Sequence, residues 1–191
     1  MASFDISILH FFHTIALATN GMATYVADAI SFFCNHSGLP IILISLALCI
    51  PKKTRKYGVG MIIAMAMGAI LTNLLIKPVV ARPRPYQSGD PDLLAWWQYA
   101  GSHMEKEYSF PSGHTTAMMA AMSAIYILGS FKHKYLVYIP VILMGMSRNY
   151  LMVHYPTDVL GGVVIGLIGA LLMYSIMKRL ESTQLYKTYI E

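Results

Sequence analysis

Long apolar stretches separated by short polar segments form the pattern of this 191-residue chain. Apolar stretches of about 20 residues are long enough to cross the hydrocarbon core of a bilayer as α-helices. The pattern predicts four such helices, at residues 57–76, 115–131, 135 to about 151, and 156–177. We therefore expect an all-α fold, an integral membrane helical bundle.

Two further apolar segments are less regular. Residues 22–50 are interrupted by polar residues, a glycine and Pro40, so they form either one kinked helix or two short ones. Residues 4–18 are short for a bilayer crossing, and we expect them to lie in the membrane interface, with a sixth short helix as the alternative. The predicted bundle thus has five to six helices.

Composition strengthens the membrane assignment. Hydrophobic residues make up 56% of the chain, charged residues only 12%, and the mean hydropathy is +0.54. An ordinary soluble domain carries about 25% charged residues. With no visible linker or repeat, residues 1–191 are predicted to form a single domain in the bilayer.

Basic residues indicate the orientation of the helices. One side of the predicted spans receives Lys52, Lys53, Arg55, Lys56, Lys132, Lys134, Lys178, Arg179 and Lys187. The other side receives Lys77, Arg82, Arg84, Lys106 and Arg148. Because positive residues favour the cytoplasm, the first side should lie inside. The net charge of +5 therefore reports topology, and we expect no nucleic-acid partner.

Three polar blocks, residues 77–85, 111–114 and 147–158, lie at the ends of apolar stretches. A charged group at the bilayer centre costs roughly 2.5 to 3.5 kcal/mol, so charges close to a membrane span commonly carry function. Each predicted helix crosses the membrane once, which brings all three blocks to the outward face. We expect one outward active-site region there.

The first block, KPVVARPRP, contains Lys77, Arg82 and Arg84 among prolines that prevent a regular helix. Arginine offers a planar fork of donors for phosphate oxygens, and lysine offers a compact charge. These residues are candidate phosphate ligands. Anchoring at the headgroups is the alternative explanation.

The second block, PSGH, contains Ser112, Gly113 and His114 directly before an apolar helix. Serine is a preferred N-cap, and a helix N-terminus attracts anions. Glycine allows a ligand to approach the backbone, and histidine can transfer a proton near neutral pH. Ordinary helix capping beside an interfacial histidine is the alternative.

The third block contains Arg148, His154 and Asp158. The four-residue spacing from histidine to aspartate can bring a carboxylate to one ring nitrogen, which leaves the other nitrogen free to attack. A surface histidine next to a helix-start aspartate is the alternative. A phosphoryl-transfer site needs the combination of all three blocks.

The three motifs K-x6-RP, PSGH and SR-x5-H-x3-D resemble the signatures of the type 2 phosphatidic acid phosphatase (PAP2) superfamily, in its membrane-bound bacterial branch. The resemblance implies that His154 attacks phosphorus to form a phosphohistidine, that Asp158 orients it and that His114 protonates the leaving oxygen. It further implies that the phosphoryl oxygens are held by Lys77, Arg84, Ser112, Gly113 and Arg148, with Arg82 as a second-rank ligand. No metal or other cofactor takes part in that scheme.

The implied function is a lipid phosphatase that acts on a phosphate monoester or diphosphate headgroup. The first substrate that we expect is undecaprenyl diphosphate. Some phosphatases that act on this lipid carry PSDH where this chain has PSGH. Phosphatidylglycerophosphate, phosphatidic acid and a lipid A phosphate are alternatives. Related haloperoxidases are soluble, which the hydropathy disfavours.

Two other classes of function stay open. A lipid or anion transporter would usually show paired broken spans, and only residues 22–50 look interrupted. A lipid-binding scaffold would not need both His114 and His154. The small residues of GVVIGLIGA suit close helix packing, either within the chain or between the chains of a dimer.

The remaining histidines are not expected to form a metal site, because none lies in a cluster with a recognised ligand spacing. They are His10, His13, His36, His103 and His133.

Overall fold

The computed structural model describes residues 3–184 and 186, without the side chains of residues 36 and 37. Throughout these residues the regular elements are helical, which confirms the predicted all-α class. In chain order the α-helices are α1 (Ser3–Ala18), α2 (Ala23–Phe32), α3 (Asn35–Cys49), α4 (Lys52–Ala69), α5 (Lys77–Val80), α6 (Pro91–Tyr99), α7 (Gly113–Leu128), α8 (Ile139–Tyr150) and α9 (Pro156–Leu180). A π-helix, η1 (Ile70–Ile76), and two 3-10 helices, η2 (Pro85–Gln87) and η3 (Lys134–Tyr138), connect them.

Within the described residues, two helical segments are long and apolar enough to cross a membrane, Lys52–Gln87 and Pro156–Leu180. The helices α7 and α8 are shorter than the sequence pattern predicts. The former ends before Gly129 in extended backbone, and the latter begins at Ile139, after a 3-10 turn and with Pro140 in its first turn. Proline is favoured in a first helical turn because it lacks the N–H that would otherwise need a partner.

Residues 22–50 form two helices, α2 and α3, which is one of the two predicted alternatives. The break lies at Phe33 and Cys34, and Cys34 leaves helical geometry with φ −117° and ψ 4°. Pro40 lies inside α3 without ending it. Gly38 takes a left-handed φ of 81°, so Pro40 falls in the first turn of the apolar helical segment Gly38–Cys49, where its missing N–H needs no partner.

The predicted helix at residues 57–76 ends in a π-helical turn. The backbone N–H of Lys77 donates to the carbonyl of Thr72, five residues back. Pro78 follows directly, and a proline cannot donate to the carbonyl four residues back and collides with it in a regular α-turn. Widening the turn removes this conflict, and such π segments commonly lie at functional sites.

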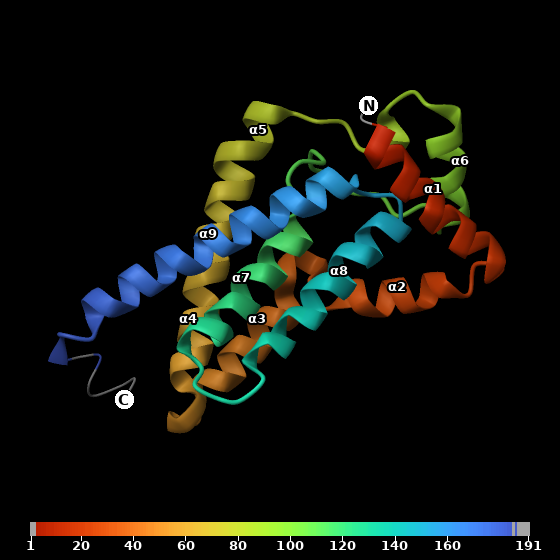
Figure 1. Cartoon of the computed structure of the whole chain (residues 1–191). Helices are drawn as coiled ribbons and strands as arrows, with labels where there is room; N and C mark the ends of the chain where they lie inside the picture. The colour runs from red at the N-terminus through yellow and green to blue at the C-terminus, as the bar shows by residue number, and fades with distance from the viewer. Residues whose placement is uncertain (1–2, 185, 187–191) are drawn as a thin grey trace.

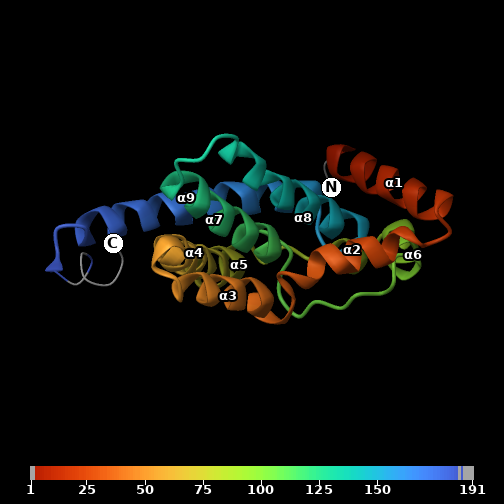
Figure 2. The ribbon, with the colours of Figure 1, turned by 90° about the horizontal axis from the view of Figure 1, so that it is seen from below.

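Small residues bring α4, α7 and α9 into close contact (Figures 1 and 2). A Cβ atom on Gly169 of α9 would lie 2.8 Å from the carbonyl oxygen of Ala64 in α4. A Cβ on Gly166 would lie 2.6 Å from the carbonyl oxygen of Thr116 in α7. The small residues of GVVIGLIGA therefore pack helices within the chain.

The N-terminal helix α1 lies beside α6 at one end of the bundle (Figure 1). Its residues Leu9, Phe12 and Ala16 are buried in a cluster with the turn that joins α8 to α9. That turn carries His154, so α1 packs against the back of the predicted site.

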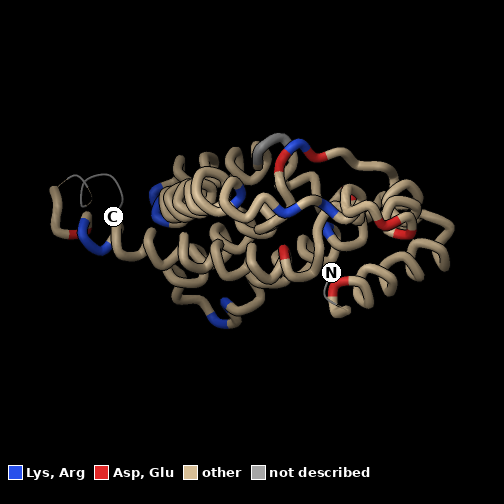
Figure 3. Tube along the Cα trace, turned by 90° about the horizontal axis from the view of Figure 1, so that it is seen from above, with Lys and Arg blue, Asp and Glu red and all other residues tan. Residues whose placement is uncertain are grey.

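The distribution of side chains suits a membrane protein. Large apolar side chains on the outside of the bundle, such as Leu74, Ile142 and Val164, are more than half exposed. Charged residues gather at the helix ends, in particular at the start of α4, the end of α9 and the α7–α8 connection (Figure 3). Lys187, which belonged to the predicted inner group, lies outside the described residues.

Candidate functional site

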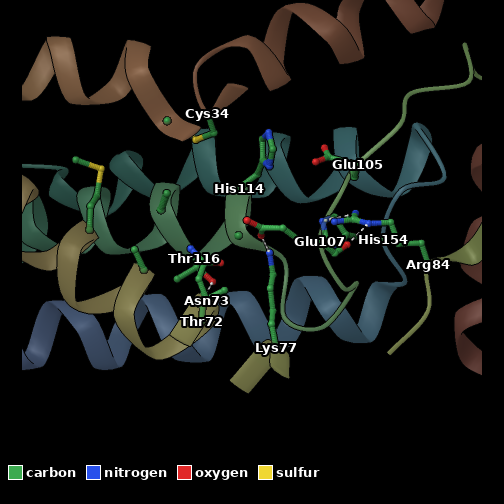
Figure 4. A pocket seen from close by; sticks show the side chains of 15 residues that line it. Cys34, Thr72, Asn73, Lys77, Arg84, Glu105, Glu107, His114, Thr116 and His154 are labelled. Carbon is green, nitrogen blue, oxygen red and sulfur yellow. Dashed lines mark hydrogen bonds and ion pairs between the residues drawn. The ribbon is translucent and has the colours of Figure 1, made fainter. Parts of the chain in front are cut away.

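A cavity of about 220 Å³ lies where the end of η1, the start of α7 and the loop after α6 meet (Figure 4). The three predicted polar blocks all contribute to its wall. It is lined by Cys34, Gly38, Met65, Ala69, Thr72, Asn73, Lys77, Arg84, Glu105, Glu107, Gly113, His114, Thr116, Ala117 and His154. One end is therefore charged and the other is lined by small and apolar side chains.

Lys77 enters the cavity from the first turn of α5 (Figure 4). The side chain is 7% exposed, and its ammonium group forms an ion pair with Glu107, whose side chain is 59% exposed. Gly113 lies opposite, since a Cβ at this position would be 3.7 Å from Lys77 Nζ. The absence of a side chain there keeps space open next to the ammonium group.

Arg84 lines the cavity and holds two backbone segments together. Its Nη1 donates to the carbonyl of Val153 at 2.8 Å, and its Nε donates to the carbonyl of Glu107 at 2.8 Å. Nη1 also lies 3.3 Å from Nε2 of His154 (Figure 4). Because a guanidinium group only donates, this contact requires an Nε2 atom with a free lone pair.

His154 lies in the turn between α8 and α9, outside the membrane-spanning helices, and is 1% exposed. Burial, and then the positive charges of Arg84, Arg148 and Lys77, lower the pKa of His154 well below its ordinary value. The imidazole is therefore neutral near pH 7. With Nε2 facing Arg84, the ring proton belongs on Nδ1.

Asp158 lies behind the imidazole, in the first turn of α9. Its Oδ2 atom is 3.6 Å from His154 Nδ1, longer than a formed hydrogen bond. The same oxygen accepts from the hydroxyl of Ser109 and from the backbone N–H of Tyr155 at 2.9 Å. Contacts of catalytic groups are often long before a substrate binds, so this geometry permits the predicted pairing.

Ser112 is the N-cap of α7, as its position in the sequence predicted, and its Oγ accepts from the N–H of Thr115 at 3.4 Å. The side chain is fully buried and lies outside the cavity wall. His114 does line the cavity, and its Nε2 lies 3.0 Å from Oδ1 of Asn35 at the start of α3. The amide oxygen only accepts, so this contact places a proton on Nε2 of His114.

Arg148, in the last turn of α8, lines an adjoining cavity that shares Glu105 and His114 with the first one. It forms an ion pair with Glu105, and its Nη1 donates to Ser31 Oγ at 3.1 Å. Both of the cations Lys77 and Arg148 thus face a glutamate from the loop at residues 105–107.

Arg82 lies apart from the cavity wall. Its guanidinium group donates to Asp158 Oδ1 at 2.6 Å and to Asp5 Oδ2 at 2.8 Å. The structure thus brings Lys77, Arg84, Gly113, His114 and His154 to one cavity, with Arg148 in the adjoining one and the remaining predicted residues behind them.

Several residues of the site were not foreseen from the sequence. They are Asp5, Asn35, Thr72, Asn73, Glu105, Glu107 and Ser109. Asp5 could have been recognised as a candidate from the sequence, because it is the one charged residue of the apolar segment 4–18. The two glutamates could not, since a polar loop between helices is expected to carry charges of either sign.

The histidines that were set aside have other partners. His13 stacks on Trp96 with ring centroids 5.2 Å apart, and His10 contacts the same ring. His133 contacts Tyr135, and the side chain of His36 lies outside the described part. His103 borders the adjoining cavity, where its Nε2 lies 3.0 Å from Oδ1 of Asp28.

Comparison with known sequences identifies one family. The sequence model of the PAP2 superfamily matches residues 57–182, a range that includes all three polar blocks. Undecaprenyl-diphosphatase of Sulfolobus acidocaldarius is 32% identical over 125 residues, which cover 64% of this chain and 56% of that protein. Phosphatidylglycerophosphatase B of Bacillus subtilis is 34% identical over 125 residues, 60% of this chain and 56% of that enzyme. The chain thus spans little more than half the length of these relatives.

A third relative is covered more fully. Decaprenylphosphoryl-5-phosphoribose phosphatase of Mycobacterium tuberculosis is 32% identical over 144 residues, which cover 73% of this chain and 72% of that protein.

Two solved structures share the fold. The transmembrane PAP2-type phosphatidylglycerolphosphate phosphatase from Bacillus subtilis superposes with a TM-score of 0.62 at 26% identity, covering 96% of this chain and 100% of that one. The LpxE protein of Aquifex aeolicus superposes with a TM-score of 0.64 at 22% identity, covering 87% and 94%.

Proposed function

Because the chain belongs to the PAP2 superfamily, we propose that it is a multi-pass membrane enzyme that hydrolyses the phosphate headgroup of a lipid. One observation carries the proposal. A buried, neutral imidazole at His154 lines a cavity that also holds the cations of Lys77 and Arg84, and a carboxylate lies behind its second nitrogen. A nucleophile with its own orienting carboxylate serves covalent catalysis and is not needed for transport or scaffolding.

The proposed reaction has two steps. Nε2 of His154 forms a bond to phosphorus while the bond from phosphorus to the bridging oxygen breaks. His114, charged when the negative phosphate binds beside it, gives a proton to that departing oxygen. Water then attacks the phosphohistidine and gives a proton to His114, the phosphorus–nitrogen bond breaks, and inorganic phosphate leaves. During both steps the negative charge on the phosphoryl oxygens is stabilised by Lys77, Arg84 and Arg148.

Asp158 would stabilise the positive charge that His154 acquires during attack. Its Oδ2 atom faces Nδ1 at 3.6 Å, and a small rotation of the imidazole on substrate binding would close this distance to a hydrogen bond.

Two glutamates of the loop at residues 105–107 form ion pairs with cations that a bound phosphate would need. Glu107 pairs with Lys77, and Glu105 pairs with Arg148. A phosphate dianion offers more charge and more acceptor oxygens than one carboxylate. We expect the substrate to displace both side chains, which are more exposed than their cationic partners.

For the substrate we propose a polyprenyl diphosphate, undecaprenyl diphosphate in particular. Two of the relatives, from Sulfolobus acidocaldarius and Mycobacterium tuberculosis, are named for activity on polyprenyl-linked phosphates. Phosphatidylglycerophosphate is the second candidate, favoured by the relative and the solved structure from Bacillus subtilis. Both substrates present a terminal phosphate on an apolar chain, which suits a cavity that is charged at one end and apolar at the other.

We further propose that the site faces outward. The start of α4, the α7–α8 connection and the end of α9 carry the basic clusters, and the proposed site lies at the opposite ends of these helices. Basic clusters favour the cytoplasmic side.

The test is a phosphate-release panel with purified protein and no added metal. The substrates are undecaprenyl diphosphate, phosphatidylglycerophosphate and phosphatidic acid. We expect the highest kcat/KM with the polyprenyl diphosphate. Release from another lipid alone would correct the substrate, and release from none of them would reject the enzyme in favour of a transporter or scaffold.

A further inference from the structure

Arg82 connects two buried carboxylates that are far apart in the sequence. Asp5 of α1 is 1% exposed and Asp158 of α9 is fully buried. The guanidinium group lies between them, with Nη1 2.6 Å from Asp158 Oδ1 and Nη2 2.8 Å from Asp5 Oδ2. We infer that Arg82 and Asp5 are positioning residues, which hold the carboxylate of Asp158 in the orientation that His154 needs. This inference rests on the proposed function of His154.

The contacts of Asp158 fix both of its oxygens. Oδ1 accepts from Arg82, while Oδ2 accepts from Ser109 and from the backbone N–H of Tyr155. With donors on each oxygen, the carboxylate cannot rotate without losing hydrogen bonds in a buried place. Oδ2 is thereby kept toward Nδ1 of His154.

Arg82 is itself held from three sides. Its Nη1 also donates to Thr157 Oγ1 at 2.7 Å, Asp5 accepts from Nη2, and the guanidinium carbon lies 3.9 Å from the ring centre of Tyr155. A guanidinium group that is stacked on an aromatic ring and hydrogen-bonded at both Nη atoms has little freedom to rotate. Arg82 is not among the residues that line the cavity, and its Nη atoms donate to Thr157, Asp158 and Asp5, so its charge acts on Asp158 and not on a bound phosphate.

Asp5 adds a second link between α1 and α9. Its Oδ1 accepts from the backbone N–H of Thr157 at 3.0 Å, and its Oδ2 accepts from the hydroxyl of the same residue at 2.9 Å. Asp5 thus satisfies an N–H group in the first turn of α9, two residues after Tyr155. The start of α1 lies next to the start of α9 and the segment that follows α5 (Figure 1).

This role is not implied by the family match, which begins at residue 57 and leaves α1 outside. The N-terminal helix would then be part of the scaffold of the reaction. Removing Arg82 would leave two buried carboxylates facing each other, and removing Asp5 would free one end of Arg82.

The experiment separates positioning from phosphate binding. Steady-state hydrolysis of farnesyl diphosphate, a short polyprenyl diphosphate, is measured for wild type, Asp5→Asn, Arg82→Gln and the double variant, together with inhibition by inorganic phosphate. For both single variants we expect kcat to fall by about tenfold or more, with KM and the inhibition constant of phosphate within about twofold of wild type. Because Asp5 acts through Arg82, kcat of the double variant should match that of Arg82→Gln.

Three controls accompany these variants. Asp92→Asn and Arg179→Gln make the same chemical changes at exposed positions, and both should behave as wild type. Thermal midpoints in detergent show whether each variant is folded. If Asp5→Asn does not fold, Arg82→Lys decides the question, since it keeps the charge without the fork and should give a kcat between wild type and Arg82→Gln.

A rise in KM and in the phosphate inhibition constant at unchanged kcat would show that Arg82 is a phosphate ligand and would overturn the inference. Losses of kcat that multiply in the double variant would also overturn it. A wild type that releases phosphate neither from farnesyl diphosphate nor from any lipid of the panel above, or an active His154→Ala, would instead reject the proposed function itself.

Discussion

His154 combines deep burial with three neighbouring cations, and both features keep its imidazole neutral. A neutral ring has the lone pair that a nucleophile needs. We expect His154→Ala to abolish phosphate release, to below about one part in a thousand, because no other side chain replaces the attacking atom. Release of inorganic phosphate is the measurement. The control is His133→Ala, an exposed histidine that should leave activity unchanged, and full activity of His154→Ala would contradict the proposal.

The lowered pKa of His154 also has a consequence for stability. In the unfolded chain its pKa returns to about 6.5. As pH falls below that value the unfolded state binds a proton that the folded state does not, so the free energy of unfolding decreases. Above about pH 6.5 this residue contributes no pH dependence.

We therefore expect acidification from pH 7.5 to 5.5 to lower the thermal midpoint of wild type more than that of His154→Gln. Thermal unfolding in detergent at both pH values is the measurement. An equal fall in the two proteins would mean that folding leaves the pKa of His154 unchanged, which would contradict the prediction.

The ion pair of Lys77 with Glu107 competes with phosphate in the proposed reaction. A partly exposed pair is worth roughly 0.2 to 1 kcal/mol, which corresponds to about a 1.4- to fivefold change in binding. We expect Glu107→Gln to lower the inhibition constant of inorganic phosphate by that factor. Glu181→Gln, at the exposed end of α9, is the matched control, and weaker phosphate binding by Glu107→Gln would show that the glutamate assists binding.

Among the elements, the contact between α4 and α9 decides how closely the three polar blocks approach one another. Gly169 leaves no room for a side chain, because a Cβ would lie 2.8 Å from the carbonyl oxygen of Ala64 and 2.9 Å from the backbone nitrogen of Gly68. Alanine normally stabilises a helix by about 1 kcal/mol relative to glycine. At this position the destabilisation caused by overpacking should be larger than that gain.

We expect Gly169→Ala to lower the free energy of unfolding by about 1 kcal/mol net, measured as a lower thermal midpoint in detergent. Ser175→Ala, on the exposed face of the same helix, should stay within about 0.5 kcal/mol of wild type. A more stable Gly169→Ala protein would show that the two helices can separate without penalty.

At the scale of the whole molecule, the orientation in the membrane is the property to test. We expect a single cysteine at position 90, in the loop beside the site, to react with a membrane-impermeant thiol reagent in intact cells. A cysteine at position 54, at the start of α4, should react only after the cells are opened. The background for both is a variant in which Cys34 and Cys49 are replaced by alanine. The reverse pattern would place the site in the cytoplasm.

The sequence by itself determined the helical class, the family and five of the residues that line the cavity, namely Lys77, Arg84, Gly113, His114 and His154. Apolar stretches about 20 residues long have few folding options in a bilayer, because every backbone polar group there must be paired internally. Lys77, Arg84, His114 and His154 could be selected because charged and polar residues next to such stretches are rare. Their roles in catalysis stay predictions.

The tertiary structure decided which side chains from distant parts of the sequence meet, because the local pattern of residues does not contain this information. The pairing of Glu107 with Lys77 joins residues 30 positions apart, and the contact of Arg82 with Asp5 joins residues 77 positions apart. Arg82 and Arg84 look alike in the sequence, yet Arg82 contacts the back of Asp158 and Arg84 contacts His154. Which neighbour a charged side chain meets depends on how α1, α7 and α9 pack together, and that packing follows from glycines and long-range contacts.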